Sequence, residues 1–264
     1  MDNRPVIGVA VAVVVIAAGS WYLFRHYREA PPALEPVIAR AVVEPAPEPG
    51  IQHPLPAGEP TMQAGLPALG DSDAPLLDAL AKLAGQPAIA TFLKPEGLVR
   101  NIVVTIDNLP RQKVALDKRP VPPVGGSFLA QGDELQATLD PQNYERYRPL
   151  VAVIDKLDVQ KLAQLYIRYY PLFQESYQNL GYPSGYFNDR LVQVIDVLLA
   201  TPQVQGTIEL SRPNVLYTFA DPAMEARPAG QKLLIRMGPD NAAKIKAKLM
   251  QLRAVITTAP PLKQ

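Results

Sequence analysis

Cysteine is absent from this sequence of 264 residues, and histidine occurs only twice. Without a thiol the chain has no disulfide, no cysteine nucleophile and no thiolate metal site. His26 and His53 both precede residue 73, where we expect the folded region to begin. That region therefore lacks the groups for Ser-His-Asp or Cys-His catalysis and for histidine-ligated zinc. We predict no catalytic residue, no metal site and no cofactor.

Sequence signals for nucleotides and nucleic acids are also missing. The chain contains neither a GxGxxG fingerprint nor a Walker A loop. Its 26 Lys and Arg residues are nearly balanced by 25 Asp and Glu residues, which gives a formal net charge of +1. This balance is too even for a nucleic-acid-binding surface, so we expect no nucleic-acid partner.

One long uncharged run lies near the beginning of the chain. Residues 5–24, PVIGVAVAVVVIAAGSWYLF, contain no charged side chain, and a helix of this length rises about 30 Å, which matches a bilayer's hydrocarbon layer. We predict a single transmembrane helix that contacts the lipid bilayer. A cleaved signal peptide is the alternative, since residues 17–20 are small. The aromatic residues that precede Arg25 favour a retained span.

Residues 25–72 are rich in proline, as in EPAPEPG at 44–50. Such a segment buries too little apolar surface to order itself, so we predict a disordered, semi-rigid linker. The basic residues on the two sides of the span slightly favour a cytoplasmic body. In contrast, a short leading tail, one span and a proline-rich spacer are typical of bacterial proteins that reach into the periplasm. We expect a single-pass inner-membrane protein with a periplasmic domain.

Residues 73–258 are expected to form one mainly helical globular domain, followed by a C-terminal tail at 259–264. Two segments alternate apolar and polar residues around turn residues and predict short β-hairpins, at 127–139 and 206–219. The fold class is therefore mainly α, or α+β with two short β-hairpins. Apolar residues at helical spacing predict helices at about 73–84, 96–109, 140–154, 158–181, 187–200, 229–237 and 240–256.

Three stretches of the sequence are similar to a known family. They are FLKPEGLVRNIVVTIDNLPR, RYYPLFQESYQNLGYPSGYFNDRLVQVIDVLLATP and FADPAMEARPAGQKLLIRMG. Together they resemble the bacterial family catalogued as domain of unknown function 3014. The resemblance covers about residues 73–256, with the span and linker in the family's usual place. The family has no assigned activity, so the resemblance implies no functional residues.

Tyrosines are concentrated between residues 166 and 191. In a helix, Tyr169 would lie just outside the main aromatic face and Glu175 opposite to it. We interpret the aromatic face as packed on the core rather than as a platform for ligands, and we expect Pro171 to kink the helix. Buried tyrosines would still need hydrogen-bond partners. The residues of this face are Tyr166, Tyr170, Phe173 and Tyr177.

The stretch GYPSGYFNDRL, 181–191, leaves helical periodicity because it holds two glycines and a proline. A loop held between helices often carries binding groups. In the alternative interpretation it is a tight connection in which Asn188 or Asp189 caps the next helix. If the chain has a ligand site, its predicted contacts are Tyr182, Tyr186, Asn188 and Arg190.

The last predicted helix carries basic side chains on both flanks of an apolar stripe. Such a helix can lie on anionic lipid, with the basic residues at the membrane surface. It can equally be a core helix whose long basic side chains extend over its edges, which is the interpretation that we favour. The membrane-surface candidates are Lys244, Lys246, Lys248 and Arg253.

These features favour a non-catalytic binding or assembly module of the bacterial cell envelope, with an envelope protein or a glycan as partner. One alternative is a glycan-acting hydrolase, because glycosidases need only two suitably spaced carboxylates. Another is a lipid-surface sensor that uses the basic last helix. The carboxylates available for hydrolysis, each interpreted here as solvated or capping, are Glu175, Asp189, Asp196, Asp221 and Glu225.

Overall fold

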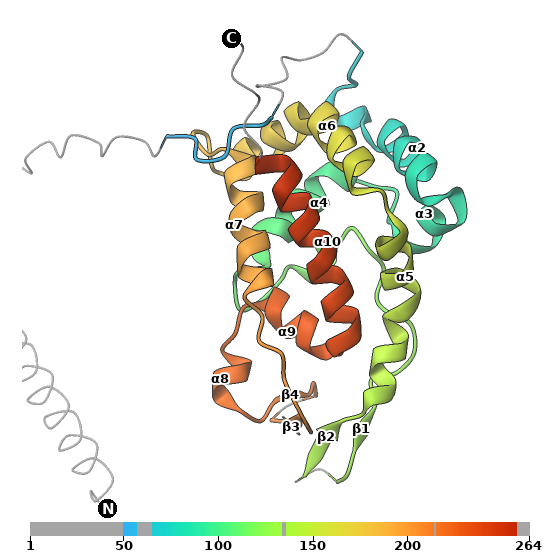
Figure 1. Cartoon of the computed structure of the whole chain (residues 1–264), viewed down its shortest axis with the longest axis vertical. Coiled ribbons are helices and arrows are strands. Elements are labelled where there is room, and N and C mark those ends of the chain that lie inside the picture. Colours follow the sequence, from blue (N-terminus) through green and yellow to red (C-terminus); the bar gives the residue numbers. More distant parts are fainter. Residues whose placement is uncertain (1–49, 57–64, 134–135, 214, 258–264) are drawn as a thin grey trace, which may run out of the picture. The chain divides into compact units, whose positions relative to one another are not determined.

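The structure is a computed structural model that describes residues 50–56, 65–133, 136–213 and 215–257 (Figure 1). The described residues all belong to one unit of the chain, Pro49–Gln264. The predicted span, most of the predicted linker and the C-terminal tail lie outside the described residues. Within the described ranges, no helix has the length and apolarity needed to cross a membrane.

The described domain is mainly helical with one small antiparallel sheet, as predicted (Figure 1). Its α-helices are α2 (Asp73–Ala84), α3 (Gln86–Phe92), α4 (Leu98–Asn108), α5 (Arg148–Lys156), α6 (Val159–Asn179), α7 (Phe187–Leu199), α8 (Pro222–Glu225), α9 (Ala229–Arg236) and α10 (Pro239–Thr257). Short 3-10 helices occupy Leu69–Asp71, Leu116–Lys118 and Pro141–Arg146. The strands are β1 (Ala130–Gln131), β2 (Ala137–Leu139), β3 (Glu209–Ser211) and β4 (Thr218–Phe219).

One predicted helix is divided in two. The segment expected at 140–154 begins as the 3-10 helix Pro141–Arg146, and α5 starts only at Arg148. Pro149 explains the break, because it has no N–H to donate to the carbonyl of residue 145 and its ring crowds that carbonyl, so an α-helix cannot continue through this point. Asp140 nevertheless caps the first segment, since its carboxylate accepts a hydrogen bond from the Gln142 N–H at 2.8 Å.

The two predicted hairpins are present, and they join into a single sheet with the strand order β1-β2-β3-β4. The joint is the antiparallel pairing of β2 with β3, in which Ala137 is opposite Leu210. Alternation places side chains of all four strands, two of them from β2, in or against a small core that also includes Ile235 of α9. The sheet is therefore fixed to the helical part of the domain by apolar contacts.

Helix α10 contacts α5, α6, α7 and α9, and Figure 1 shows it between α7 and α5. Its Ile256 is fully buried in a cluster with Ala163 of α6 and with Val192 and Ile195 of α7. Leu252 packs against the same cluster. Within the described domain, α10 is thus a core helix.

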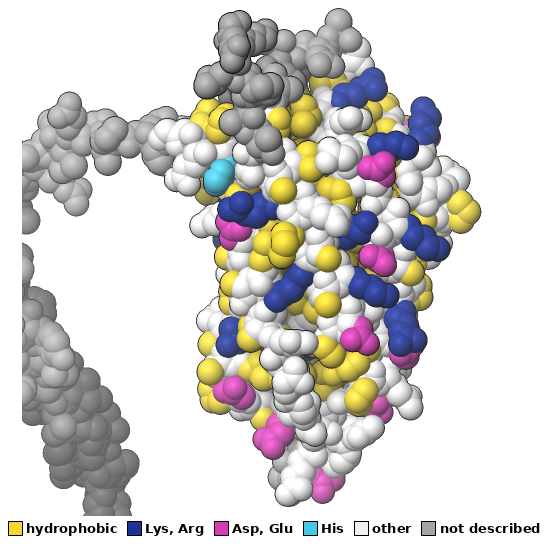
Figure 2. All heavy atoms as spheres, viewed as in Figure 1, with side chains coloured by type: hydrophobic (Ala, Val, Ile, Leu, Met, Phe, Trp, Pro, Cys, Tyr) yellow, Lys and Arg dark blue, Asp and Glu magenta, His cyan; other side chains and the backbone are white. Residues whose placement is uncertain are grey.

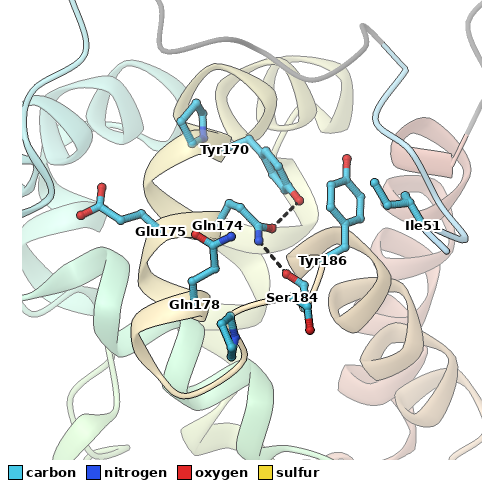
Figure 3. A pocket seen from close by; sticks show the side chains of 10 residues that line it. Ile51, Tyr170, Gln174, Glu175, Gln178, Ser184 and Tyr186 are labelled. Atoms are coloured by element: carbon cyan, nitrogen blue, oxygen red, sulfur yellow. Dashed lines mark hydrogen bonds between the residues drawn. The ribbon is translucent and has the colours of Figure 1, made fainter. Parts of the chain in front are cut away.

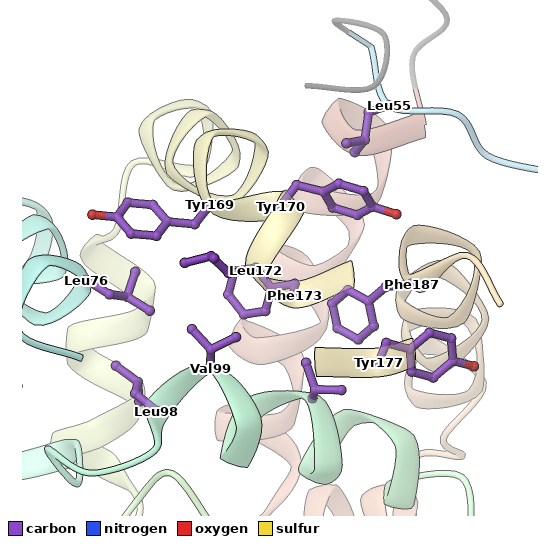
Figure 4. Packing of buried hydrophobic residues seen from close by; sticks show 11 residues of the cluster. Leu55, Leu76, Leu98, Val99, Tyr169, Tyr170, Leu172, Phe173, Tyr177 and Phe187 are labelled. Atoms are coloured by element: carbon purple, nitrogen blue, oxygen red, sulfur yellow. The ribbon is translucent and has the colours of Figure 1, made fainter. Parts of the chain in front are cut away.

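The aromatic face of α6 is packed on the core, as predicted (Figure 4). Tyr170, Phe173 and Tyr177 are buried, and Tyr166 packs against them. Tyr169 is buried as well, although the helical wheel placed it outside this face. The difference arises because α6 contacts both α2 and α4 in addition to α7, so more than one face of the helix is covered. Helix α6 runs through Pro171 without interruption.

An ion pair near the sheet, between Glu225 and Lys232, should make the stability of the domain depend on pH. Burial favours the neutral form of the Glu225 carboxyl, but the Lys232 ammonium at 2.6 Å and the Phe219 N–H at 3.0 Å outweigh this and lower its pKa. A carboxyl group whose pKa is lower in the folded state than in the unfolded state stabilises the fold at pH values above its unfolded-state pKa. This stabilisation is lost as the pH falls through its folded-state pKa. We expect Glu225→Gln to lower the free energy of unfolding by about 1 kcal/mol at pH 7.

That difference should shrink as the pH falls from 5 to below 4, which urea unfolding of the two full-length proteins at several pH values would measure. The control is Glu145→Gln, because the Glu145–Arg148 pair is more than half exposed on both sides. Its removal should change the stability by less than about 0.5 kcal/mol at any pH. An undiminished Glu225→Gln difference at pH 3.5 would contradict the assignment.

Candidate functional site

Residues 50–56, which we call the strap, lie against the beginning of α7. The Asp189 carboxylate accepts hydrogen bonds from the Gln52 N–H at 3.0 Å and the His53 N–H at 2.6 Å. Leu55 is only 1% exposed and joins the aromatic core cluster. The range that we assigned to a disordered linker, 25–72, therefore includes a segment that packs on the domain, and His53 belongs to that segment. Composition alone does not reveal this, because the hydrogen-bond partners of the strap come from a distant part of the sequence.

The hydrogen bonds of the strap can be tested by amide exchange. Leu55→Ala should weaken strap docking by about 2 kcal/mol, because it removes a buried side chain. We expect the protection of the Gln52 and His53 amides to fall about 30-fold, since about 1.4 kcal/mol corresponds to a factor of ten. Ile51→Ala is the matched control, because Ile51 is 50% exposed and its loss should leave the protection unchanged. Equal protection in all three proteins would show that the strap is not docked through Leu55.

A pocket of about 580 Å³ opens between α6, the loop 183–186 and the strap (Figure 3). One part of its wall is apolar and aromatic, formed by Ile51, two prolines and the ring of Tyr186. The other part is polar and includes Glu175, Gln178 and Ser184. Among the described contacts, none of these three polar side chains has a hydrogen-bond or ion-pair partner, so their polar atoms remain available to a ligand.

The floor of the pocket is held in place by Gln174. Its side-chain oxygen accepts hydrogen bonds from the Tyr170 hydroxyl and the Phe187 N–H, both at 2.8 Å, and its amide donates to the Gly185 carbonyl at 2.6 Å. Burial, together with the neighbouring hydroxyls of Tyr166 and Tyr186, raises the pKa of Tyr170. The Tyr170 hydroxyl therefore stays protonated and acts as a donor. Gln174 thus ties the loop to α6.

Gly185 allows the loop to approach the helix closely. A Cβ atom at this position would lie 2.8 Å from a ring carbon of Tyr177 and 2.9 Å from the Cβ of Tyr182. The rings of Tyr177 and Tyr182 are stacked with centroids 4.6 Å apart, so neither can easily move away. The absence of a side chain at Gly185 is therefore part of what shapes this edge of the pocket.

The four predicted ligand contacts lie in two places. Tyr186 and Asn188 contact the strap, whereas Tyr182 and Arg190 contact the carboxylate of Asp107. Tyr186 lines the pocket, and its hydroxyl accepts a hydrogen bond from the Leu55 N–H of the strap at 3.3 Å. Asn188 is fully buried. Its side-chain amide donates hydrogen bonds to the backbone carbonyls of His53 at 2.8 Å and Ile256 at 3.2 Å. Its side-chain oxygen accepts a hydrogen bond from the Tyr166 hydroxyl. Asn188 therefore joins the strap to the end of α10 and does not face the pocket.

The alternative role that the sequence suggested for this loop, capping of the next helix, is wrong for both candidates. The N-cap of α7 is Tyr186, and no side chain caps the helix there. Asn188 and Asp189 lie within the first turn, and both side chains turn instead toward the strap. Asp189 caps the backbone of a distant segment rather than its own helix.

Tyr182 and Arg190, the other two predicted contacts, meet at a buried carboxylate that the sequence analysis missed. Asp107 has a side chain only 3% exposed and accepts from Arg190 Nε at 3.0 Å and from Arg111 Nη2 at 2.6 Å. Arg190 Nη2 also donates to the Asp107 carbonyl at 2.7 Å, and the Tyr182 hydroxyl donates to the carboxylate at 3.4 Å. The spacing of Asp107 and Arg111, four residues apart at the end of a helix, was the available signal. Arg190 belongs to a different helix, α7, and gives no such local signal.

Residues 98–253 match the model of a protein family described as "Protein of unknown function (DUF3014)". The match spans more than half of the chain and agrees with the resemblance seen in the sequence. The chain belongs to this family. No curated protein and no solved structure matches it. The matched range of this DUF3014 protein begins at α4 and ends within α10, so it includes Asp107, the Gln174 floor and the 181–191 loop but not the strap.

The basic residues of α10 in the DUF3014 domain are mostly engaged in contacts with neighbouring helices. Lys246 donates to the Thr201 carbonyl after α7, and Lys248 donates to the Leu157 carbonyl after α5 at 3.0 Å. Arg253 forms a bidentate pair with Asp196, at 2.6 and 3.0 Å. Lys244 is exposed. Figure 2 shows Lys and Arg side chains interspersed with acidic and hydrophobic ones on this face.

Most of the carboxylates considered for hydrolysis already have structural partners. Asp189 holds the strap, Asp196 pairs with Arg253, and Asp221 caps α8 by accepting from the Ala223 N–H. Glu225 pairs with Lys232. Glu175 is the exception, as an exposed residue on the rim of the pocket. Within the described ranges, no group of three or more His, Cys, Asp or Glu side chains is arranged to hold a metal ion.

Proposed function

We propose that this DUF3014 protein is a membrane-anchored, non-catalytic binding module of the bacterial cell envelope, and that it binds a glycan in the pocket between α6 and the strap. The observation that carries the proposal is the composition of the pocket wall. An aromatic ring and proline rings face the same space as three polar side chains without partners among the described contacts, Glu175, Gln178 and Ser184. Ligand sites typically combine an apolar surface with a few such polar groups.

A sugar ring has two kinds of surface that suit this wall. Its C–H face packs on apolar and aromatic side chains, here the ring of Tyr186 with Pro171 and Pro183. Its hydroxyl and acetamido groups both donate and accept hydrogen bonds, as do the amide of Gln178 and the hydroxyl of Ser184. The pocket wall contains no Lys or Arg among its described residues, which makes a phosphate or another strong anion a poor ligand.

The same wall favours binding over hydrolysis. Glycosidases use two carboxyl groups, about 5 Å apart in retaining enzymes and about 6.5–9.5 Å apart in inverting ones. Among the described residues that line this pocket, Glu175 is the single carboxylate. It can accept hydrogen bonds from a sugar but has no partner acid in that part of the wall.

The location of the protein is inferred from the sequence. An uncharged run at 5–24 and a proline-rich linker would hold the domain near the inner membrane while letting it reach glycan on the periplasmic side. Alkaline phosphatase fused after Gln264 should be active, because that enzyme matures only outside the cytoplasm. A β-galactosidase fusion at the same residue should be inactive. An active β-galactosidase fusion with an inactive alkaline phosphatase fusion would place the domain in the cytoplasm, where it could not reach a periplasmic glycan.

Glycan binding can be measured by cosedimentation of the detergent-solubilised full-length protein with purified peptidoglycan sacculi. We expect the protein to sediment with the sacculi, and Gln178→Ala and Glu175→Gln to reduce the bound fraction at least fivefold. Both side chains are exposed, so neither change should disturb the fold. Gln164→Ala is the matched control, an exposed glutamine of α6 that does not line the pocket.

Two results would overturn the proposal. If the protein stays in the supernatant, or if all three variants sediment equally, the pocket does not bind this glycan, and a protein partner becomes the better hypothesis. If instead the sacculi release soluble fragments and Glu175→Gln abolishes the release, the protein is a hydrolase.

A further inference from the structure

We infer that the DUF3014 domain has a second site, an apolar cavity between five helices that holds the end of one acyl chain. The cavity has a volume of about 200 Å³ and is lined by side chains of α2, α4, α6, α7 and α10. Every described residue of its wall is Leu, Ile, Phe or Tyr. It lies on the side of α6 that faces the helical core, whereas the glycan pocket lies beside the loop 183–186.

The chemistry of the wall restricts the ligand to a hydrocarbon group. Its single hydroxyl among the described residues belongs to Tyr166, and this hydroxyl donates to the Asn188 side chain at 3.0 Å. A polar group inside the cavity would therefore lose its hydrogen bonds to water without replacement, which is strongly unfavourable. A sugar, a peptide backbone or a charged group does not fit these walls.

The size of the cavity indicates how much of a ligand it can hold. Protein interiors normally pack without voids much larger than a water molecule. A dry cavity of about 150 Å³ lined by similar side chains accommodates benzene, so the 200 Å³ here corresponds to a chain of about six to eight carbons. Its walls come from helices that are far apart in the sequence, and most of the side chains that line it belong to the aromatic core cluster or pack against it.

The wall of the cavity is partly exposed, so the head group of a bound lipid can stay outside it. Leu162 and Leu252 of the wall are only partly buried, so the cavity reaches the surface on α6 and α10. Each of them is next to a basic residue, Lys161 and Arg253, but these side chains are already paired with Asp158 and Asp196, so they do not select the head group. An acyl chain can enter end first while its polar head group remains outside in water.

The test uses the full-length protein in phosphatidylcholine vesicles that contain a photoactivatable diazirine near the end of an acyl chain. In one arm the chain is a free fatty acid, and in the other it belongs to phosphatidylglycerol. After irradiation, mass spectrometry locates the label. We expect label on peptides that carry cavity residues, such as Leu80 or Leu165, and excess unlabelled decanoate should reduce it at least fivefold. Label in only one arm would identify whether the source is a free fatty acid or a membrane lipid.

Variants that fill the cavity provide the matched comparison. Leu165→Trp should reduce labelling of the domain at least fivefold while labelling of residues 5–24 is unchanged. Leu80→Phe approaches the cavity from a different helix and is available if the tryptophan variant does not fold. Leu233→Trp, a similar change at a 43% exposed leucine outside the cavity, should have no effect. If both arms leave the wall peptides unlabelled, or if neither decanoate nor the filled variants reduce the label, the inference is wrong.

Discussion

Replacing Asp107 by alanine should lower the free energy of unfolding of this DUF3014 protein by about 3 kcal/mol. The carboxylate is 3% exposed and is the shared partner of Arg190 and Arg111. Without it, the Arg190 guanidinium, which is 19% exposed, loses its ionic partner in a partly buried position. This loss is near the lower end of the range expected when a buried ion pair is broken, because Arg190 keeps its hydrogen bonds to the Asp107 carbonyl and to Gln193.

Urea unfolding of the full-length variants would measure this loss, and a double-mutant cycle would divide it between the two arginines. Arg111→Ala alone should cost less than about 1 kcal/mol, because that side chain is 54% exposed. The coupling energy between Asp107 and Arg190 should therefore exceed that between Asp107 and Arg111. A destabilisation below about 1 kcal/mol for Asp107→Ala, the range of an exposed pair, would mean that the cluster contributes little to stability.

Local patterns in the sequence were sufficient to predict the main helices and both hairpins. The aromatic face of α6 follows from a 3.6-residue period, and the burial of Tyr170, Phe173 and Tyr177 confirms it. The caps at Asp140 and Asp221 follow from an acceptor placed directly before a proline. In each case the signal and the structure that it determines lie within a few turns of the chain.

Apart from the helix α3 and the break before α5, the features that the sequence did not predict depend on contacts between distant residues. The pairing of β2 with β3 joins two hairpins that are separated in the sequence by α5, α6 and α7, and neither hairpin contains a signal for the other. Docking of the strap depends on Asp189 and Asn188, whose positions suggested a helix cap. The stretch 181–191 is non-helical only up to Tyr186, because α7 begins at Phe187, and only Tyr186 among its four predicted contacts lines the pocket.

The strap also lies between the predicted span and the candidate site in the sequence. Ile51 contributes to the pocket wall, and Leu55 enters the aromatic core cluster that supports α6 and α7. The segment that connects the domain to the predicted span is therefore itself part of the proposed glycan site. Removal of residues 50–56 should alter the pocket even though every remaining wall residue is unchanged.

Phe187→Ala should have the largest effect on stability that we expect, a loss of about 4 kcal/mol in the free energy of unfolding. Phe187 is fully buried at the start of α7, and its ring is stacked on Phe173 with centroids 5.8 Å apart. It also contacts the ring of Tyr177 (Figure 4) and the ring of Tyr166. Alanine would remove these contacts and enlarge the apolar cavity, in whose wall Phe187 lies.

Phe187→Leu is the control for this change, because leucine retains most of the buried volume and should cost only about 1.5 kcal/mol. The Phe187 N–H bonds to Gln174 in either variant, so the difference between them reports the ring and not the backbone contact. Since Phe187 contributes to both the aromatic core and the cavity wall, an acyl chain that fills the enlarged cavity should restore part of the stability of Phe187→Ala. Urea unfolding with and without decanoate would measure that recovery. If Phe187→Ala costs no more than Phe187→Leu, the domain is not built around this aromatic cluster.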